Sequence, residues 1–147
     1  MAELLWLVDS SGWIEYFTDG PSASCFGSAI EQPEALVVPS LSVLEVYRWM
    51  LRHHGEGPAI QAIALMRQGT EVALDAGLAL RAAQLGLQWK LPLADSVMLA
   101  TALAHQATLL TQDADFEGIP AVTFIPKKAE QSGKADRASA PTINPPE

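Results

Sequence analysis

The stretch LPLADSVMLATALAHQATLLTQDADF, residues 91–116, predicts a helix, a strand and an acidic turn in direct succession. The helix covers residues 92–105, with Pro92 at an early position where its missing N–H costs nothing. This helix is apolar on almost every face, as buried helices are, yet Asp95 lies in its first turns with no lysine or arginine nearby in sequence. Because burying an unpaired charge is costly, we expect Asp95 to have a partner that the sequence does not contain.

Outward from this stretch, strand-like and helical segments alternate along the chain. The five strand-like runs are residues 4–8, 36–39, 70–75, 107–111 and 121–125. The intervening helical segments are expected from a cap at Ser10 through about residue 17, over 22–31, from a cap at Ser40 or Ser42 through about 53, over 58–68, and from 76 to about 89. Such alternation predicts a three-layer α/β/α fold, with a parallel sheet of four or five strands covered by helices on both faces.

The composition bounds the class of protein. A chain of 147 residues that is 49% hydrophobic can form one domain with a substantial core, which we assign to residues 1–126. Residues 127–147 are polar and rich in Pro and Ser, which predicts a disordered tail. A single cysteine, Cys25, excludes a disulfide framework and predicts a cytoplasmic location, and no apolar run is long enough to span a membrane.

The charge is strongly negative, with 17 acidic against 9 basic residues and a net charge of −8. Such a body repels nucleic acid unless cations mediate the contact. The sequence therefore predicts either a ligand other than nucleic acid or a bound cation.

Acidic residues gather where ligands bind in a parallel sheet, beyond the carboxyl ends of the strands. Asp9 directly follows the first strand, while Asp113 and Asp115 follow the fourth. Glu45 lies one turn into the helix after the second strand, and Asp95 lies early in the helix that leads into the fourth. Their mutual repulsion, about 1–4 kcal/mol per close pair, is removed by a hard divalent cation such as Mg²⁺, which prefers oxygen ligands. Two cations beside Glu45, Arg48 and Arg52, are candidates for contacting a phosphate backbone.

Each acid also has a purely structural interpretation. Asp9 is a possible N-cap of the next helix, and Glu45 a possible i,i+3 partner of Arg48 on a solvated face. Asp95 is a first-turn acid of the kind that the helix dipole favours. Asp113 and Asp115 are common turn residues. Single positions do not separate the two interpretations, whereas acids at several strand ends together favour a metal site.

Three segments carry a resemblance to a known family: VDSSGWIEYF with Asp9, LSVLEVYR with Glu45, and LPLADSVMLATALAHQATLLTQDADFEGI with the other three acids. Together they resemble the PIN domain, specifically its VapC-type toxin branch, over about residues 4–125. The third segment is the most specific of the three.

The resemblance implies a Mg²⁺- or Mn²⁺-dependent endoribonuclease whose catalytic acids are Asp9, Glu45, Asp95 and Asp113. It implies metal ligation by Asp9, Asp95 and by Asp113, Asp115 or both. Ser10 and Thr111 match positions where the family often has a supporting hydroxyl. Similar toxins form homodimers and are inhibited by a small antitoxin protein. Dimerisation is also suggested by the number of large apolar residues in short early helices: Trp13, Phe17, Phe26 and Trp49.

Two other interpretations are compatible with part of this pattern. A PIN-type nuclease of RNA maturation would have the same acids and no antitoxin. A receiver-like signalling switch also has a parallel sheet and an acidic Mg²⁺ pocket, and Asp9, Asp75, Thr111 and Lys127 can be aligned with it. A receiver has no use for Glu45 or Asp95, which favours the nuclease.

Overall fold

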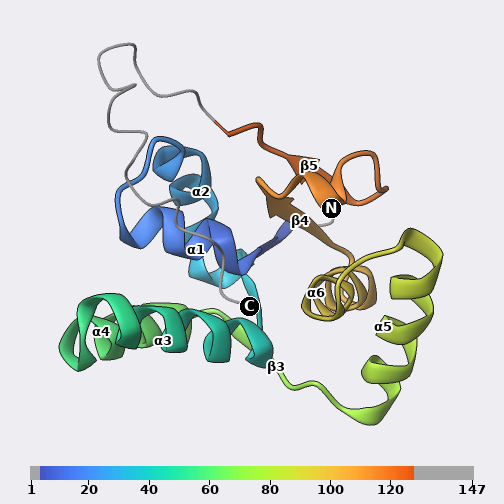
Figure 1. Cartoon of the computed structure of the whole chain (residues 1–147), viewed down its shortest axis with the longest axis horizontal. Coiled ribbons are helices and arrows are strands. Elements are labelled where there is room, and N and C mark those ends of the chain that lie inside the picture. The colour runs from blue at the N-terminus through green and yellow to red at the C-terminus, as the bar shows by residue number, and fades with distance from the viewer. Residues whose placement is uncertain (1–3, 128–147) are drawn as a thin grey trace.

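The computed structural model describes residues 4–127 and has a parallel sheet at its centre (Figure 1). The strands are β1 (Leu5–Val8), β2 (Val37–Pro39), β3 (Thr70–Val72), β4 (Ala107–Thr111) and β5 (Val122–Phe124). β4 pairs in parallel with both β1 and β5, and β2 pairs in parallel with β3. A parallel bridge between Trp6 and Leu36 joins the two groups, which gives the order β3-β2-β1-β4-β5. The predicted α/β fold with a parallel sheet is confirmed.

Strand β3 is shorter than predicted, because residues 73–75 are not paired in the sheet and lead into a helix that begins at Ala76. Asp75 is the N-cap of that helix, and its side chain accepts a hydrogen bond from the backbone N–H of Leu78 at 2.9 Å. The apolar pattern predicted a strand as far as residue 75, whereas Asp75 serves as the cap that starts the helix.

Six helices cover the sheet in the described part of the chain. They are α1 (Ser10–Phe17), α2 (Ala23–Ile30), α3 (Ser40–His54), α4 (Glu56–Met66), α5 (Ala76–Trp89) and α6 (Leu93–Ala104). Neither Ser40 nor Ser42 caps α3, contrary to the prediction, because Pro39 takes that position and the Ser42 hydroxyl donates to the sulfur of Met98 at 3.3 Å. None of these helices has both the length and the apolar character that a membrane-spanning helix needs.

Successive strand residues face two separate cores, as the two-residue period of a strand requires. Val8 and Leu110 pack with α1 to α4 on one face, whereas Leu7 and Leu109 pack with α5 and α6 on the other. Figure 1 shows these two groups of helices on opposite sides of β1 and β4. The helices of both layers meet at the carboxyl ends of the central strands, where the acids were expected.

The large apolar residues of the early helices are mostly buried inside this fold. Trp13 and Phe26 are fully buried and Trp49 is 4% exposed, so the prediction that they form an exposed apolar surface is wrong. The helices can approach closely because Gly12 has no Cβ, which would lie 2.6 Å from the ring of Phe26 and 2.8 Å from Val8. These aromatic residues belong to the core on one face of the sheet, and therefore do not support dimerisation.

The polar tail predicted at residues 127–147 lies outside the described residues except for Lys127. We expect deletion of residues 130–147 to change the melting temperature by less than about 2 °C, since a polar segment with one large apolar side chain can bury little surface. Thermal unfolding of the full and shortened chains measures this directly. A decrease several times larger would mean that the tail packs on the domain.

Candidate functional site

Five carboxylates from four separate segments line one cavity of about 860 Å³ at the carboxyl ends of the central strands. They are Asp9, Glu45, Asp95, Asp113 and Asp115. Oxygen atoms of Asp95, Asp113 and Asp115 lie within 4.8 Å of one another. All five acids singled out in the sequence therefore meet in one place.

Asp9 is the N-cap of α1 and also the most buried of the five acids, with 5% of its surface exposed. Its Oδ1 accepts a hydrogen bond from the backbone N–H of Ser10 at 2.7 Å. Its Oδ2 accepts from the hydroxyl of Thr111 at 2.9 Å and from that of Ser11 at 3.2 Å. The capping interpretation of Asp9 is confirmed, and it is compatible with a place in the site because the same carboxylate lines the cavity.

The pKa of Asp9 is raised, chiefly by burial, against the lowering effect of the Thr111 hydrogen bond. The nearby charge of Asp113 raises it further. The fold thus holds a carboxylate in position at a cost that a bound cation would remove.

Glu45 projects from α3 toward Asp9 and is fixed by Ser10, whose hydroxyl donates to Oε1 at 2.6 Å. Burial raises the pKa of Glu45, and the charge of Asp9 adds to this. Because Glu45 is partly buried in the cavity wall, its interpretation as a residue of a solvated helix face is wrong. Arg48 and Arg52 are exposed on the same helix and line neither this cavity nor the second one described below.

Asp95 is the first-turn acid of α6, as the dipole interpretation predicted. The next seven residues, 96–102, are all buried, whereas Leu93 before it is 84% exposed, so the helix enters the core only beyond Asp95. Burial, followed by the charges of Asp9, Asp113, Asp115 and Glu45, raises the pKa of Asp95 to about 8. Every charge that acts on this group is a carboxylate, and among residues 4–127 none of the site acids forms an ion pair.

Asp113 and Asp115 lie on a single 3₁₀ turn, Ala114–Phe116, that follows β4. Asp113 is the N-cap of this turn: its Oδ1 accepts from the backbone N–H of Asp115 at 2.9 Å. Its own N–H donates to the hydroxyl of Thr111 at 2.9 Å, so Thr111 links Asp113 to Asp9. The turn interpretation is confirmed, and the turn itself aims both side chains at Asp95.

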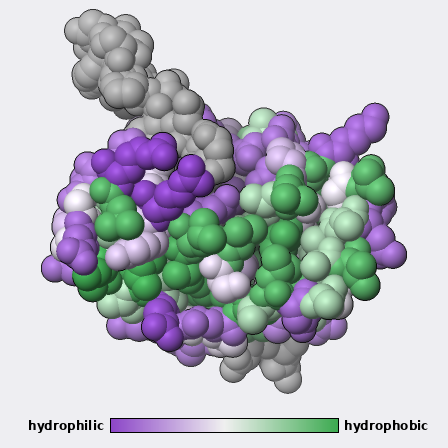
Figure 2. All heavy atoms as spheres, turned by 60° about the horizontal axis from the view of Figure 1, so that its bottom comes forward, coloured by the Kyte–Doolittle hydropathy of each residue, from purple (hydrophilic) through white to green (hydrophobic). Residues whose placement is uncertain are grey.

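Apolar side chains surround the acids. Leu44 (56% exposed), Leu74 (42%) and Leu93 (84%) line the same cavity from α3, the segment before α5, and α6. In Figure 2 a green, hydrophobic band runs across this face of the molecule between purple borders. Exposed apolar surface of this kind beside a charged site is typical of a protein contact.

Sequence reasoning missed two features of the site. Ser11 contacts Asp9 although only Ser10 and Thr111 were predicted to support the acids; a hydroxyl two residues after an N-cap acid was the available signal. Gln112, buried between Thr111 and Asp113, went unnoticed because a neutral amide has no metal-site signature.

A model of the PIN domain matches residues 6–122 of the chain. The chain belongs to the PIN domain family. The match includes all five acids and every strand except the start of β1 and the end of β5. A search of the curated proteins gave no match.

Solved structures with the same fold include PIN domain toxins. A toxin–antitoxin complex from Klebsiella pneumoniae superposes with a TM-score of 0.69 at 24% identity, covering 80% of this chain and 94% of that one. VapC20 of Mycobacterium tuberculosis, described as a toxin that cleaves the sarcin-ricin loop, gives 0.65 at 16% identity, covering 82% and 96%. DNA-bound VapBC from Salmonella typhimurium gives 0.66 at 12% identity, covering 86% and 100%. These likenesses show the fold.

The alternative of a receiver-like switch is wrong. Membership in the PIN domain family excludes it. In addition, Asp75 is exposed, is occupied as the N-cap of α5, and does not line the acidic cavity.

Proposed function

We propose that this PIN domain is a Mg²⁺- or Mn²⁺-dependent endoribonuclease and the toxin of a VapBC-type toxin–antitoxin pair. One observation carries the nuclease proposal: five carboxylates converge on one cavity, where three of them have raised pKa values. The fold maintains this repulsion through dedicated hydrogen bonds from Ser10, Ser11 and Thr111. Carboxylates exposed to solvent would have a lower free energy than carboxylates crowded in this cavity. A bound cation that neutralises their charge best explains why the fold keeps them together.

The donor set fits a hard divalent ion. Carboxylate oxygens are the ligands that Mg²⁺ prefers, and two oxygens on one ion lie up to about 4.2 Å apart for metal–oxygen distances of about 2.1 Å. The carboxylate oxygens of Asp95, Asp113 and Asp115 lie at most 4.8 Å apart, so small side-chain rotations suffice to bring them onto one ion. We assign the ligand role to these three acids and to Asp9, as the resemblance implied.

When bound, the ion supplies a water molecule with a lowered pKa and stabilises negative charge on the phosphate. The remaining tasks fall to the protein. Glu45 lies outside the three-carboxylate cluster, and its raised pKa suits it to accept a proton from a water beside Asp9. Ser10 holds Glu45 in place, and Thr111 holds Asp9 and the backbone of Asp113. Arg48 and Arg52, on the exposed side of α3, are proposed to meet the RNA backbone away from the acids.

Incubation of the purified chain with structured and single-stranded RNA tests this function. We expect cleavage with Mg²⁺ or Mn²⁺ and none with EDTA, and Ca²⁺ serves to distinguish binding from cleavage. Metal-independent cleavage, or none with any divalent ion across a diverse RNA pool, would contradict the proposal.

The antitoxin part of the proposal rests on the apolar rim of the acidic cavity and on the structural neighbours crystallised as toxin–antitoxin complexes. The partner would match the apolar rim if its own apolar residues packed on Leu44 and Leu93. It would match the acidic cavity if one of its arginines paired with the carboxylates. The expected location is the cytoplasm, in keeping with the one cysteine. The alternative of an RNA-maturation nuclease keeps the same site and needs no such partner.

We expect the chain to be a homodimer and to arrest growth when expressed without its antitoxin. Light scattering at tens of micromolar protein measures the oligomeric state, and induction of the chain alone in a bacterial host measures growth arrest.

Leu93→Ser should weaken antitoxin binding about tenfold, from the loss of one buried leucine at an interface. Leu87→Ser, at an equally exposed leucine of α5, is the matched control. A monomeric chain whose active form is harmless would favour the maturation nuclease.

A further inference from the structure

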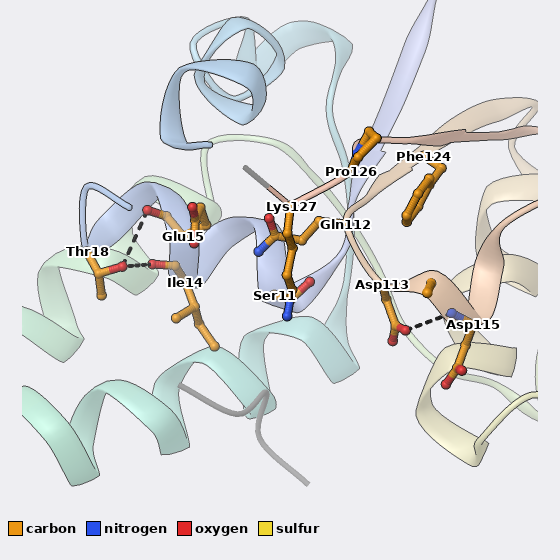
Figure 3. Close-up of a pocket in the computed structure, with 11 residues that line it drawn as sticks. Ser11, Ile14, Glu15, Thr18, Gln112, Asp113, Asp115, Phe124, Pro126 and Lys127 are labelled. Carbon is orange, nitrogen blue, oxygen red and sulfur yellow. Dashed lines mark hydrogen bonds between the residues drawn. The ribbon is translucent and has the colours of Figure 1, made fainter. Parts of the chain in front are cut away.

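A second cavity, of about 620 Å³, opens on the other side of the α1 N-terminus. It shares Ser11, Asp113 and Asp115 with the acidic cavity, so the two meet at the carboxylates. Figure 3 shows α1 on one side of this second cavity and the chain following β4 on the other, with Asp113 and Asp115 at one end. A strand of RNA with its phosphate at the acids would have its next nucleotide at this opening.

Gln112 lies in the wall of this cavity and is 8% exposed. Its side-chain amide forms no hydrogen bond among residues 4–127, whereas the hydroxyl of neighbouring Thr111 contacts both Asp9 and the backbone N–H of Asp113. In the described residues only Trp13 Nε1 and Ser22 Oγ are buried without a partner, so the polar atoms of Gln112 are open to the cavity. A side chain held at a cavity wall in this way can donate through its NH₂ group and accept through its oxygen.

A second polar group, Glu15, faces the cavity from α1 and is held rigidly. Its Oε2 accepts a hydrogen bond from the backbone N–H of Ser22 at 2.7 Å. The carboxylate lies directly over Gly20, where any Cβ would collide with it. A carboxylate fixed this way can accept from an N–H donor without losing side-chain entropy on binding.

Apolar and cationic groups complete the cavity. Ile14 and the partly buried Phe124 supply apolar walls, and the exposed Lys127 lies at the rim beside Gln112 (Figure 3). Proteins bind single nucleotides of RNA through groups of these kinds. An aromatic ring stacks on the base, an amide and a carboxylate form hydrogen bonds with its edge, and a lysine neutralises the phosphate.

We propose that this second cavity binds the nucleobase next to the cleaved bond, with Phe124 against the base, Gln112 and Glu15 on its polar edge, and Lys127 at the adjoining phosphate. The inference rests on the proposed ribonuclease function and adds a base preference to it. Glu15 can only accept hydrogen bonds, and the one donor on the edge of uracil, N3–H, lies between two carbonyl oxygens that repel a carboxylate. Bases that carry an exocyclic amino group (guanine, adenine and cytosine) should therefore bind better than uracil.

Binding of nucleoside 5′-monophosphates tests the cavity independently of cleavage. In NMR titrations with GMP, AMP, CMP and UMP, we expect the side-chain amide resonances of Gln112 to shift, least with UMP. Gln112→Met and Phe124→Leu should each weaken binding of the preferred nucleotide about tenfold, the scale of one lost base contact. The matched control is Gln88→Met, an exposed amide on α5 outside both cavities. Melting temperatures verify that each variant is folded.

Cleavage of an RNA pool with randomised positions gives the second measurement. Wild type should show a nucleotide preference beside the cleaved bond, which Phe124→Leu and Glu15→Gln relax while Gln88→Met does not. If wild type cleaves RNA but these variants leave both monophosphate binding and the preference unchanged, the base site is wrong and the nuclease proposal stands. If wild type cleaves no RNA, the ribonuclease proposal fails, and nucleotide-induced shifts at Gln112 then decide whether the cavity binds nucleotides at all.

Discussion

Asparagine in place of Asp95 should reduce RNA cleavage at least about 10²-fold, because charge stabilisation by a bound metal supplies several kcal/mol to the transition state. The same loss is expected for Asp9→Asn, Asp113→Asn and Glu45→Gln. Each change keeps the size of the side chain and removes one negative charge from the cavity. Cleavage rates under single-turnover conditions with saturating Mg²⁺ give the comparison.

Stability without metal should move in the opposite direction. Neutralising one of five crowded carboxylates relieves repulsion, so the free energy of unfolding should stay unchanged or rise slightly. The caps are retained in these variants, since asparagine replaces aspartate at an N-cap almost without cost, whereas the loss of a cap costs about 1 kcal/mol. Added Mg²⁺ should then stabilise wild type more than any of the variants, by mass action on the folded state.

Two acids outside the site serve as controls. Asp75→Asn changes an exposed N-cap and so matches the capping role of Asp9 without a place in the cavity. Asp19→Asn changes an exposed turn residue at φ +55°, a conformation that asparagine adopts readily. Both should leave cleavage at the wild-type level. If Asp95→Asn kept full activity and lost stability with or without metal, Asp95 would be a structural residue.

The sequence was sufficient for the parallel α/β fold and the acidic set because both follow from local patterns, whereas the strand order came only from the structure. Apolar runs identify strands, and in a parallel sheet the residues that follow them share an edge, so Asp9 and Asp113 were predicted together. The same local reasoning failed for Trp13 and Phe26, whose burial depends on how closely two helices pack at Gly12. It also gave no indication of Gln112, because the meaning of an amide depends on a cavity formed by residues far apart in the chain.

Capping and a place in the acidic cavity are not alternatives for these acids, because the structure combines the two. Asp9 and Asp113 both cap the segments that follow them and both line the cavity. The physical reason is shared: a carboxylate after a strand end is held by the free N–H groups of the next turn, with its remaining lone pairs facing outward. Capping thus orients carboxylate oxygens toward the cavity, and capping alone is no argument against a site role.

The stability of the metal-free protein should fall as the pH rises from about 5 to about 9. The pKa of Asp95 is raised to about 8 in the folded protein against about 4 in the unfolded chain, so between these values the folded state holds a proton that the unfolded state has lost. The stabilisation is complete below about pH 4 and is lost as the pH passes 8. Asp9 and Glu45, whose pKa values are also raised, act in the same direction.

Asp95 is partly exposed, so solvent screening reduces the expected loss of unfolding free energy to about 1–2 kcal/mol. This loss corresponds to a decrease in melting temperature of about 4–8 °C. Thermal unfolding in EDTA at pH 5.5 and 8.5 measures it, and Asp95→Asn should flatten the dependence while Asp19→Asn leaves it as in wild type. Mg²⁺ should reverse the trend, because its ligands must be deprotonated and its stabilising effect therefore grows with pH. A wild-type melting temperature that is flat with pH in EDTA would show that Asp95 titrates normally. An unaltered slope in Asp95→Asn would instead assign the trapped proton to Asp9 or Glu45, the two other site acids whose pKa values are raised.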